Sequence, residues 1–275
     1  LHFAARIKKP TVVTYHSDII RQKHLLKLYR PLMNCFLSSA DRIVAASPNY
    51  LATSDVLTQY RDKTTVIPYG LNKAAYPVPS AECSAQWRQR FGERFFLFVG
   101  VMRYYKGLHI LLEALQGTQY PVVIVGAGPL ELELRAQAQA LGLDHVHFVG
   151  RVDDNDKVAL LQLCSAIVFP SHLRSEAFGI SLLEGAMYGK PMISSEIGTG
   201  TSYINIHNQT GLVVPPSDPQ AFRAAMRTLW DNPALAEQMG QQAERRYEQL
   251  FTAERMGQHT AALYRGLLES KRTRP

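Results

Sequence analysis

Short runs of β-branched and aromatic residues alternate with longer segments of helical periodicity along most of the chain. Eight of these runs have the nearly continuous apolar character of strands that are buried on both faces. The predicted strands are Thr11–Tyr15, Arg42–Ala46, Thr65–Ile67, Phe95–Val99, Val122–Val125, Val146–Val149, Ile167–Phe169 and Met192–Ser194. The helical patterns between them are Leu108–Leu115, Leu130–Leu141, Lys157–Cys164 and Ile180–Tyr188. This alternation predicts an α/β fold with parallel sheets that helices cover on both faces.

From Gly211 onward the pattern becomes helical. We expect the last three helices at about Pro219–Trp230, Ala234–Leu250 and Ala253–Leu268. Hydrophobic residues recur in these segments with the spacing of one helix face.

A cluster of helix and strand breakers predicts a domain boundary between Pro68 and Ser84, directly after a predicted strand. We therefore divide the chain into three parts. Residues 1–75 form the C-terminal part of a first α/β domain, and residues 76–251 form a complete second one. Residues 252–275 form a C-terminal helix that packs back toward the first domain.

The composition is that of an ordinary globular protein, with 46% hydrophobic and 19% charged residues among 275. No apolar run approaches the roughly 18 residues that span a bilayer, and no signal peptide is visible. The three isolated cysteines argue against a disulfide framework or a metal cluster and suit a reducing cytoplasm. Because the chain opens at Leu1 shortly before a buried strand, we expect it to be a fragment.

The net charge of +7 is concentrated near the N-terminus. Residues 1–75 carry eleven Lys and Arg against four Asp, whereas the remaining residues carry nineteen of each sign. We expect this basic part to face an anionic surface, such as a membrane, a lipid phosphate or a nucleic acid.

Segment 175–186, Ser-Glu-Ala-Phe-Gly-Ile-Ser-Leu-Leu-Glu-Gly-Ala, predicts a loop that turns into a helix at Gly179. The amides of Phe178, Gly179 and Ile180 are then donors without helical partners. Such amides at the start of a helix bind phosphate or sugar hydroxyls.

Glu176 lies in the loop before this helix and Glu184 lies more than one turn inside it. Two carboxylates placed in this way can accept hydrogen bonds from separate hydroxyls of one extended ligand. The alternative is an amphipathic helix with two surface acids.

The spacing Glu-x7-Glu with an internal Phe-Gly resembles the signature of retaining glycosyltransferase family 4. This resemblance covers essentially the whole chain and implies the GT-B fold, in which two Rossmann-like domains face a cleft; the N-terminal domain is then incomplete here. It also implies that Glu176 contacts hydroxyls of the donor sugar and that Glu184 holds the nucleotide ribose.

The segment 98–107, Phe-Val-Gly-Val-Met-Arg-Tyr-Tyr-Lys-Gly, ends a predicted strand and places two cations, Arg103 and Lys106, before a helix. Such a pair can neutralise a diphosphate leaving group, or it can simply face solvent. The segment is similar to the family's Gly-Arg-Leu…Lys-Gly motif, except that Val101 occupies the usual Arg position. In an extended backbone Arg103 points the same way as Val101 and can substitute for the missing Arg.

Two further turns resemble family motifs. Gly126 and Gly128 belong to a Gly-x-Gly-Pro turn, which in the family shapes the nucleotide crevice. Arg151 and Val152 follow a Phe-x-Gly strand end, whose main chain in the family lies beside the base. The third Gly of a dinucleotide-binding fingerprint is absent, since Glu131 stands there.

His16 lies at the carboxyl end of the first predicted strand, where open α/β sheets place ligands. It resembles the family's acceptor-domain His, which reaches across the cleft to the donor sugar. That resemblance implies a hydrogen-bonding and charge-stabilising role. The alternative is a His that caps the next helix or packs in the core.

The next helix, about Ile19 to Ser38, alternates apolar with basic residues, among them Arg21, Lys23 and Lys27. An amphipathic basic helix can lie on an anionic membrane or bind a lipid-diphosphate acceptor; it can equally be a solvated face over a core stripe. No nucleic-acid-binding motif is present, so we expect no nucleic-acid partner.

The segment Gly198–Ser202 replaces the family's Gly-Gly-x-x-Glu loop and lacks its acid. Together with Tyr-His-Ser-Asp and Tyr-Tyr-Lys-Gly, it resembles bacterial mannosyltransferases of O-antigen and exopolysaccharide assembly. The resemblance implies transfer of mannose from GDP-mannose, with retention, to a lipid-linked or polysaccharide acceptor. It further implies a cytoplasmic protein, peripheral to the inner face of the membrane, that needs no metal or cofactor.

Two other functions stay open at this point. The Gly-x-Gly turn allows a nicotinamide-dependent oxidoreductase, and the expected loss of upstream residues allows a non-catalytic remnant that still binds nucleotide.

Overall fold

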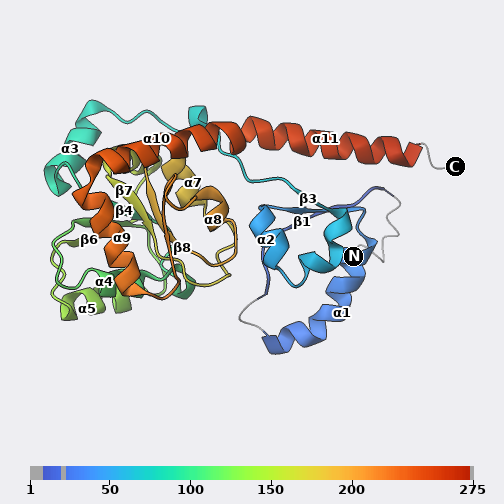
Figure 1. The fold of residues 1–275 in the computed structure, drawn as a ribbon, viewed down its shortest axis with the longest axis horizontal. Coiled ribbons are helices and arrows are strands. Elements are labelled where there is room, and N and C mark those ends of the chain that lie inside the picture. Colours follow the sequence, from blue (N-terminus) through green and yellow to red (C-terminus); the bar gives the residue numbers. More distant parts are fainter. Residues whose placement is uncertain (1–8, 20–22, 273–275) are drawn as a thin grey trace.

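The computed structural model describes residues 9–19 and 23–272 of the 275-residue chain. It contains two parallel sheets (Figure 1). Within the described residues no helix is long and apolar enough to cross a membrane.

The first sheet has the order β1-β2-β3 and is fully parallel. Its strands are β1 (Val12–Tyr15), β2 (Arg42–Ala45) and β3 (Thr64–Val66). The helices of this part are α1 (Lys23–Ser39), α2 (Pro48–Thr53) and the 3-10 helix η1 (Leu57–Lys63).

The second sheet has six parallel strands in the order β6-β5-β4-β7-β8-β9. The strands are β4 (Phe96–Val99), β5 (Val122–Val125), β6 (Val146–Gly150), β7 (Ala166–Phe169), β8 (Met192–Ser195) and β9 (Gly211–Val214). The chain runs outward from β4 to β6 and then returns to β7, so the switch point of the topology lies between β4 and β7. In open parallel sheets, ligands bind at the carboxyl ends of the strands at such a point.

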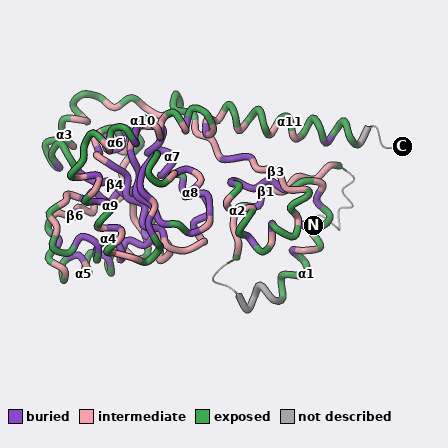
Figure 2. Tube along the Cα trace, viewed as in Figure 1, coloured by how far each residue is buried: buried purple, intermediate pink, exposed green. Residues whose placement is uncertain are grey.

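Helices cover both faces of this sheet because side chains on its strands alternate between two cores. Phe96 and Phe98 pack into one core with α4 (Leu108–Ala114), α5 (Glu131–Ala140) and α9 (Pro219–Asp231). Phe95 and Leu97 pack into the other with α3 (Ala81–Phe91), α6 (Asp154–Leu163), α7 (Ile180–Met187) and α10 (Pro233–Leu250). The central strands are buried almost throughout (Figure 2).

The two passages of the chain between the sheets lie side by side. Leu71, which precedes the 3-10 helix η2 (Lys73–Ala75), accepts from Ala253 and donates to Phe251 through its main chain. A Cβ at Gly70 would lie 2.2 Å from the carbonyl oxygen of Thr252, so only glycine allows this close approach. These contacts fix where the helix α11 (Ala253–Arg272) leaves the second domain (Figure 1).

The predicted α/β class and all eight predicted strands are confirmed, each to within one residue at either end. The expectation that the chain is helical from Gly211 onward is wrong at its start, because Gly211–Val214 forms β9 and pairs with β8. The helices α2 and α3 and the short α8 (Thr201–Ile204) were not predicted. The start of the predicted helix from Ile19, including Arg21, falls partly outside the described residues.

Candidate functional site

A cavity of about 670 Å³ lies at the switch point, between the two sheets. Its walls come from the ends of β1, β4 and β7 and from the start of α7. The lining includes the predicted site residues His16, Arg103, Lys106, Glu176, Phe178, Gly179, Ile180 and Glu184.

Lys106 and Glu176 form a largely buried ion pair in this cavity. The Lys106 Nζ lies 2.5 Å from Glu176 Oε2, and the two side chains are only 13% and 11% exposed. The loops that carry them are tied together, since the His172 amide donates to the Tyr105 carbonyl at 3.1 Å. The sequence predicted both residues for the site but not their direct contact.

The helix α7 begins at the cavity wall. Gly179 adopts φ 98° and ψ 66° and precedes the first helical residue, Ile180. The first amides of a helix have no partner within it, and here Phe178, Gly179, Ile180 and Ser181 all line the cavity. The helix starts where the sequence predicted, and anion binding by these amides stays a prediction.

Glu184 lies one turn into α7 and is 6% exposed. Its Oε1 accepts from the Tyr76 hydroxyl at 3.0 Å and from Lys157 Nζ at 3.1 Å. Burial and the charge of Glu184 raise the pKa of Tyr76 above its ordinary value, so this hydroxyl stays a donor. Although burial disfavours the ammonium of Lys157, hydrogen bonds to Asp154 and Glu184 raise its pKa, so it stays charged.

His16 enters the cavity from the other domain. Its Nδ1 lies 2.8 Å from the Tyr69 hydroxyl, and the Tyr69 ring packs edge-on against Phe178 at 5.1 Å between centroids. Burial raises the pKa of Tyr69, which keeps the phenol protonated. His16 is therefore not a core residue, since its side chain is exposed and lines the cavity.

Arg103 and Val101 both line the cavity, whereas Met102 between them is fully buried. The backbone between them is not extended as the sequence argument assumed, because the Arg103 amide donates to the Val101 carbonyl at 2.9 Å and closes a three-residue turn at Met102. Arg103 itself has φ −118° and ψ 157°, and its place in the cavity lining does not come from the alternation of a strand.

Gly126, Gly128, Arg151 and Val152 lie outside the cavity lining. The two glycines instead pack against the turn that follows β4. A Cβ on residue 126 would lie 2.0 Å from the carbonyl oxygen of Gly100. A Cβ on residue 128 would lie 2.5 Å from the carbonyl oxygen of Met102. Because these two glycines have no side chain, the turn that carries Arg103 can pack directly against their backbone.

Sequence reasoning missed three residues that hold the site together, namely Tyr69, Tyr76 and Lys157. Tyr69 and Tyr76 lie in the breaker-rich segment that we interpreted only as a domain boundary. Lys157 lies in a predicted helix with no motif around it. Aromatic residues inside a domain boundary could have indicated Tyr69 and Tyr76 as site residues. Nothing in the local sequence indicates Lys157.

In the described part of the chain, no group of three or more His, Cys, Asp or Glu is arranged to hold a metal ion. The expectation that the reaction needs no metal stays a prediction.

Comparison with known proteins finds relatives among the glycosyltransferases. The family model of the glycosyl transferases group 1 matches residues 81–246. A D-rhamnosyltransferase, WbpZ, from Pseudomonas aeruginosa is 76% identical over 253 residues, which are 92% of this chain and 66% of that protein. An O-antigen chain mannosyltransferase C from Escherichia coli is 55% identical over 271 residues, which are 98% of this chain and 73% of that protein.

Solved structures share the fold. Alr3699/HepE from Anabaena, in complex with UDP and glucose, superimposes with a TM-score of 0.81 at 23% identity, over 95% of this chain and 72% of that one. A sucrose-phosphate synthase from Thermosynechococcus elongatus superimposes with a TM-score of 0.82 at 26% identity, over 98% of this chain and 70% of that one. These structures confirm the predicted GT-B fold, and the family match shows that this chain belongs to the glycosyl transferases group 1.

Proposed function

We propose that the protein containing this chain transfers a hexose from a nucleotide sugar to a glycan acceptor, with retention of configuration. One observation carries the proposal. The Lys106–Glu176 pair and the start of α7 share one cavity, whose volume of about 670 Å³ suits a small-molecule ligand.

Sugar transfer from a nucleotide needs charge stabilisation on the departing diphosphate. Lys106, Arg103 and the first residues of α7 all line the cavity, and the two cations and the positive end of the helix dipole are proposed to supply this stabilisation. An ammonium has three donors, so Lys106 can bond to Glu176 and to a phosphate oxygen together.

The two glutamates provide acceptors at separate points. Glu176 is proposed to orient hydroxyls of the donor sugar. Glu184 engages Tyr76 and Lys157 through Oε1, so Oε2 is proposed to accept from a ribose hydroxyl. The acceptor hydroxyl approaches from the side of His16, whose Nδ1 is directed at Tyr69.

For the donor, we propose GDP-mannose and no additional cofactor. The Escherichia coli mannosyltransferase, 55% identical, supports mannose. The Pseudomonas aeruginosa relative, 76% identical, is a D-rhamnosyltransferase and favours D-rhamnose as a second candidate. The two sugars differ only in the hydroxyl at C6.

The test is a comparison of donors in the full-length protein. GDP-mannose, GDP-D-rhamnose, UDP-glucose and UDP-galactose are ranked by thermal shift and by transfer, and NMR of the product assigns the anomer. The Glu176→Ala variant should lose transfer while still folding, as a cooperative thermal transition at a lowered midpoint would show. If the wild type binds a donor but transfers no sugar, the proposed transferase activity is refuted and the chain is a nucleotide-binding remnant.

For the acceptor, we propose a lipid-linked or polysaccharide glycan of lipopolysaccharide assembly, at the cytoplasmic face of the membrane. The helix α1 offers a contact with anionic lipid. In its described part Leu28 and Leu32 are 82% and 58% exposed beside the exposed Arg30. The side chains of Lys23 and Lys27 lie outside the described set, as does residue 21.

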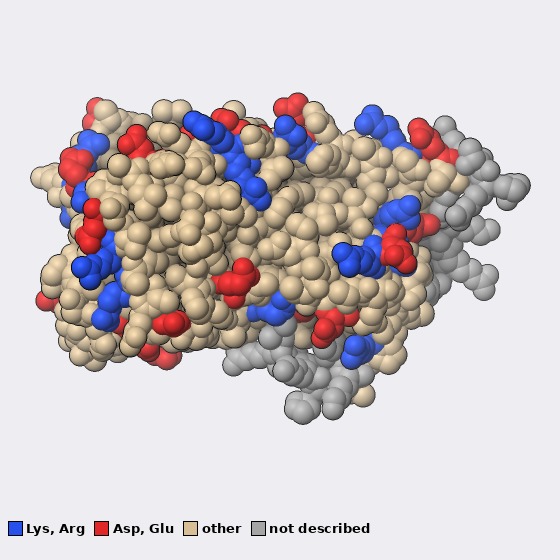
Figure 3. Space-filling model, viewed as in Figure 1, with Lys and Arg blue, Asp and Glu red and all other residues tan. Residues whose placement is uncertain are grey.

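The membrane contact is tested with sedimentation on anionic vesicles. Replacing Arg21, Lys23 and Lys27 together by Gln should reduce binding, because each basic residue near an anionic surface contributes about 1 kcal/mol. On the face in Figure 3 charges of both signs are interspersed, so this face offers little competing attraction for anionic lipid. Equal binding of variant and wild type would refute the contact.

A further inference from the structure

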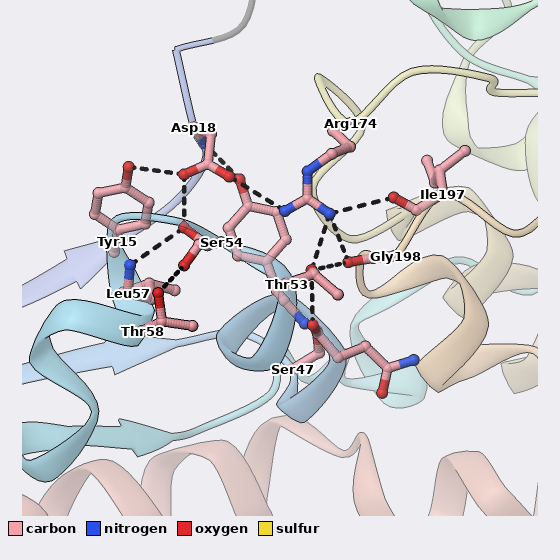
Figure 4. A network of polar contacts seen from close by, with 12 residues as sticks. Tyr15, Asp18, Ser47, Thr53, Ser54, Leu57, Thr58, Arg174, Ile197 and Gly198 are labelled. Carbon is pink, nitrogen blue, oxygen red and sulfur yellow. Dashed lines mark hydrogen bonds and ion pairs between the residues drawn. The ribbon is translucent and has the colours of Figure 1, made fainter.

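A polar cluster joins the two domains beside the cavity, centred on Asp18 and Arg174 (Figure 4). Asp18 Oδ2 lies 3.2 Å from Arg174 Nη2, and the side chains are 14% and 27% exposed. The second oxygen, Oδ1, accepts from Ser54 at 2.7 Å and from Tyr15 at 3.0 Å. The main-chain amide of Asp18 donates to the Tyr50 hydroxyl. Asp18 is therefore held firmly within its own domain.

Arg174 is held as firmly from several sides. Its Nη1 donates to Thr53 Oγ1 at 2.8 Å and to the Gly198 carbonyl at 3.0 Å. Its guanidinium also lies 5.2 Å from the centre of the Tyr50 ring. One planar side chain thus bonds to α2 of the first domain and to the loop after β8 of the second. A guanidinium can make these bonds at once because its donors form a rigid fork.

The position of the pair in the chain gives it a consequence for the cavity. Asp18 follows His16 by two residues, and Arg174 precedes Glu176 by two. The ion pair therefore joins the loop that presents His16 to the loop that presents Glu176.

We propose that Asp18 and Arg174 are positioning residues that set the distance and orientation of the acceptor side relative to the donor side. This inference rests on the proposed transfer reaction. A group transfer between two substrates held on separate domains depends on their alignment, and a misplacement of about 1 Å can cost roughly 100-fold in rate. The nucleotide itself is held by the second domain, through Lys106, Glu184 and α7, and does not need the pair.

Three variants probe the pair without emptying the cluster. In Asp18→Asn the Oδ1 still accepts from Tyr15 and Ser54. The new NH2 group then faces the guanidinium, and because both are donors the ion pair is lost. Arg174→Gln removes the charge and the fork. Arg174→Lys keeps the charge, but its single ammonium cannot reach Asp18 and Gly198 together.

We expect kcat at saturating donor and acceptor to fall about 10- to 100-fold in Asp18→Asn and Arg174→Gln. The Kd for GDP should stay within about twofold of wild type, as measured by calorimetry. The double variant should be no slower than the slower single variant, because both changes remove one interaction. Arg174→Lys should retain intermediate kcat. The control is Lys73→Gln, which should leave kcat unchanged. Lys73 Nζ lies 2.8 Å from Glu244 Oε1 in an exposed ion pair, and neither residue lines the cavity.

Other results overturn the inference in distinguishable ways. Wild-type kcat in both single variants shows that the pair positions nothing. Losses of kcat and GDP affinity in parallel with the thermal transition show a structural role only. Multiplicative losses in the double variant show two unrelated residues. A wild-type protein that transfers no sugar refutes the proposed function itself, and with it this inference.

Discussion

Replacing Lys106 by Met separates the binding of diphosphate from the binding of the nucleoside. Met preserves the length and the packing of the side chain, whose Nζ lies 4.9 Å from the centre of the Phe169 ring. What is lost is the charge beside Glu176 and its donors toward the cavity.

The substitution is expected to have two effects, one on the affinity for GDP and one on the stability of the fold. A charge-assisted hydrogen bond contributes about 1.5–3 kcal/mol, which at about 1.4 kcal/mol per decade corresponds to a roughly 10- to 100-fold weaker Kd for GDP. The fold also loses stability, because Glu176 is 8% exposed and, among the described residues, its side chain is left with the contact to Ser171 Oγ at 3.4 Å. Breaking a buried pair costs about 3–5 kcal/mol, and the partial exposure of this one lowers our expectation to about 2 kcal/mol.

The assay is calorimetric titration of GDP and of guanosine into the wild type and Lys106→Met at equal ionic strength. We expect the variant to lose affinity for GDP while its affinity for guanosine stays within about twofold. The double variant Lys106→Met with Glu176→Gln serves as the stability control, since it removes the unpaired carboxylate and should recover most of the lost thermal stability. Equal losses for GDP and guanosine, or no loss for GDP, would refute a diphosphate contact at Lys106.

Three further substitutions test other parts of the site and the fold. Tyr69→Phe removes the hydrogen bond to His16 but keeps the ring; transfer should fall about 2- to 10-fold with unchanged Kd for GDP, and an unchanged rate would show that His16 needs no orientation. Gly128→Ala places a Cβ 2.5 Å from the Met102 carbonyl oxygen; it should destabilise the fold by about 1–3 kcal/mol in denaturant unfolding, and wild-type stability would contradict the packing role. Burial and a nearby arginine lower the pKa of His147, so the unfolded state protonates first and stability is lost as pH falls from about 6.5. His147→Phe should therefore show a shallower decline of the thermal midpoint between pH 7 and 5, and an unchanged slope would assign the titration to other groups.

The sheets could be predicted because their strands are buried on both faces and read as continuous apolar runs. The exception, Gly211–Val214, is a four-residue strand at the edge of the sheet, where β8 is its neighbouring strand. It begins with a glycine and is followed by Pro215 and Pro216, residues that are typical of turns. Its local sequence favours a loop, and only the open edge of β8 makes it a strand.

The site could be predicted as a set of residues but not as a set of contacts. The motifs around Glu176 and Lys106 are local, so both residues were found, whereas their ion pair depends on how the loops after β4 and β7 meet. Lys157 illustrates the same limit more strongly. Its role depends on a contact that the fold creates between α6 and α7, where Lys157 reaches Glu184 at 3.1 Å.

The two glutamates explain why the site is charged and yet stable before any ligand binds. Each is less than a tenth exposed, and a carboxylate at such depth is costly without a counter-ion. Each receives one from a different element, Glu176 from Lys106 and Glu184 from Lys157. Folding thus already holds four charged side chains in place, so binding spends little free energy on ordering them. The same arrangement means that a substitution at any of the four alters stability together with affinity, and loss of activity at these positions is informative only beside a stability measurement.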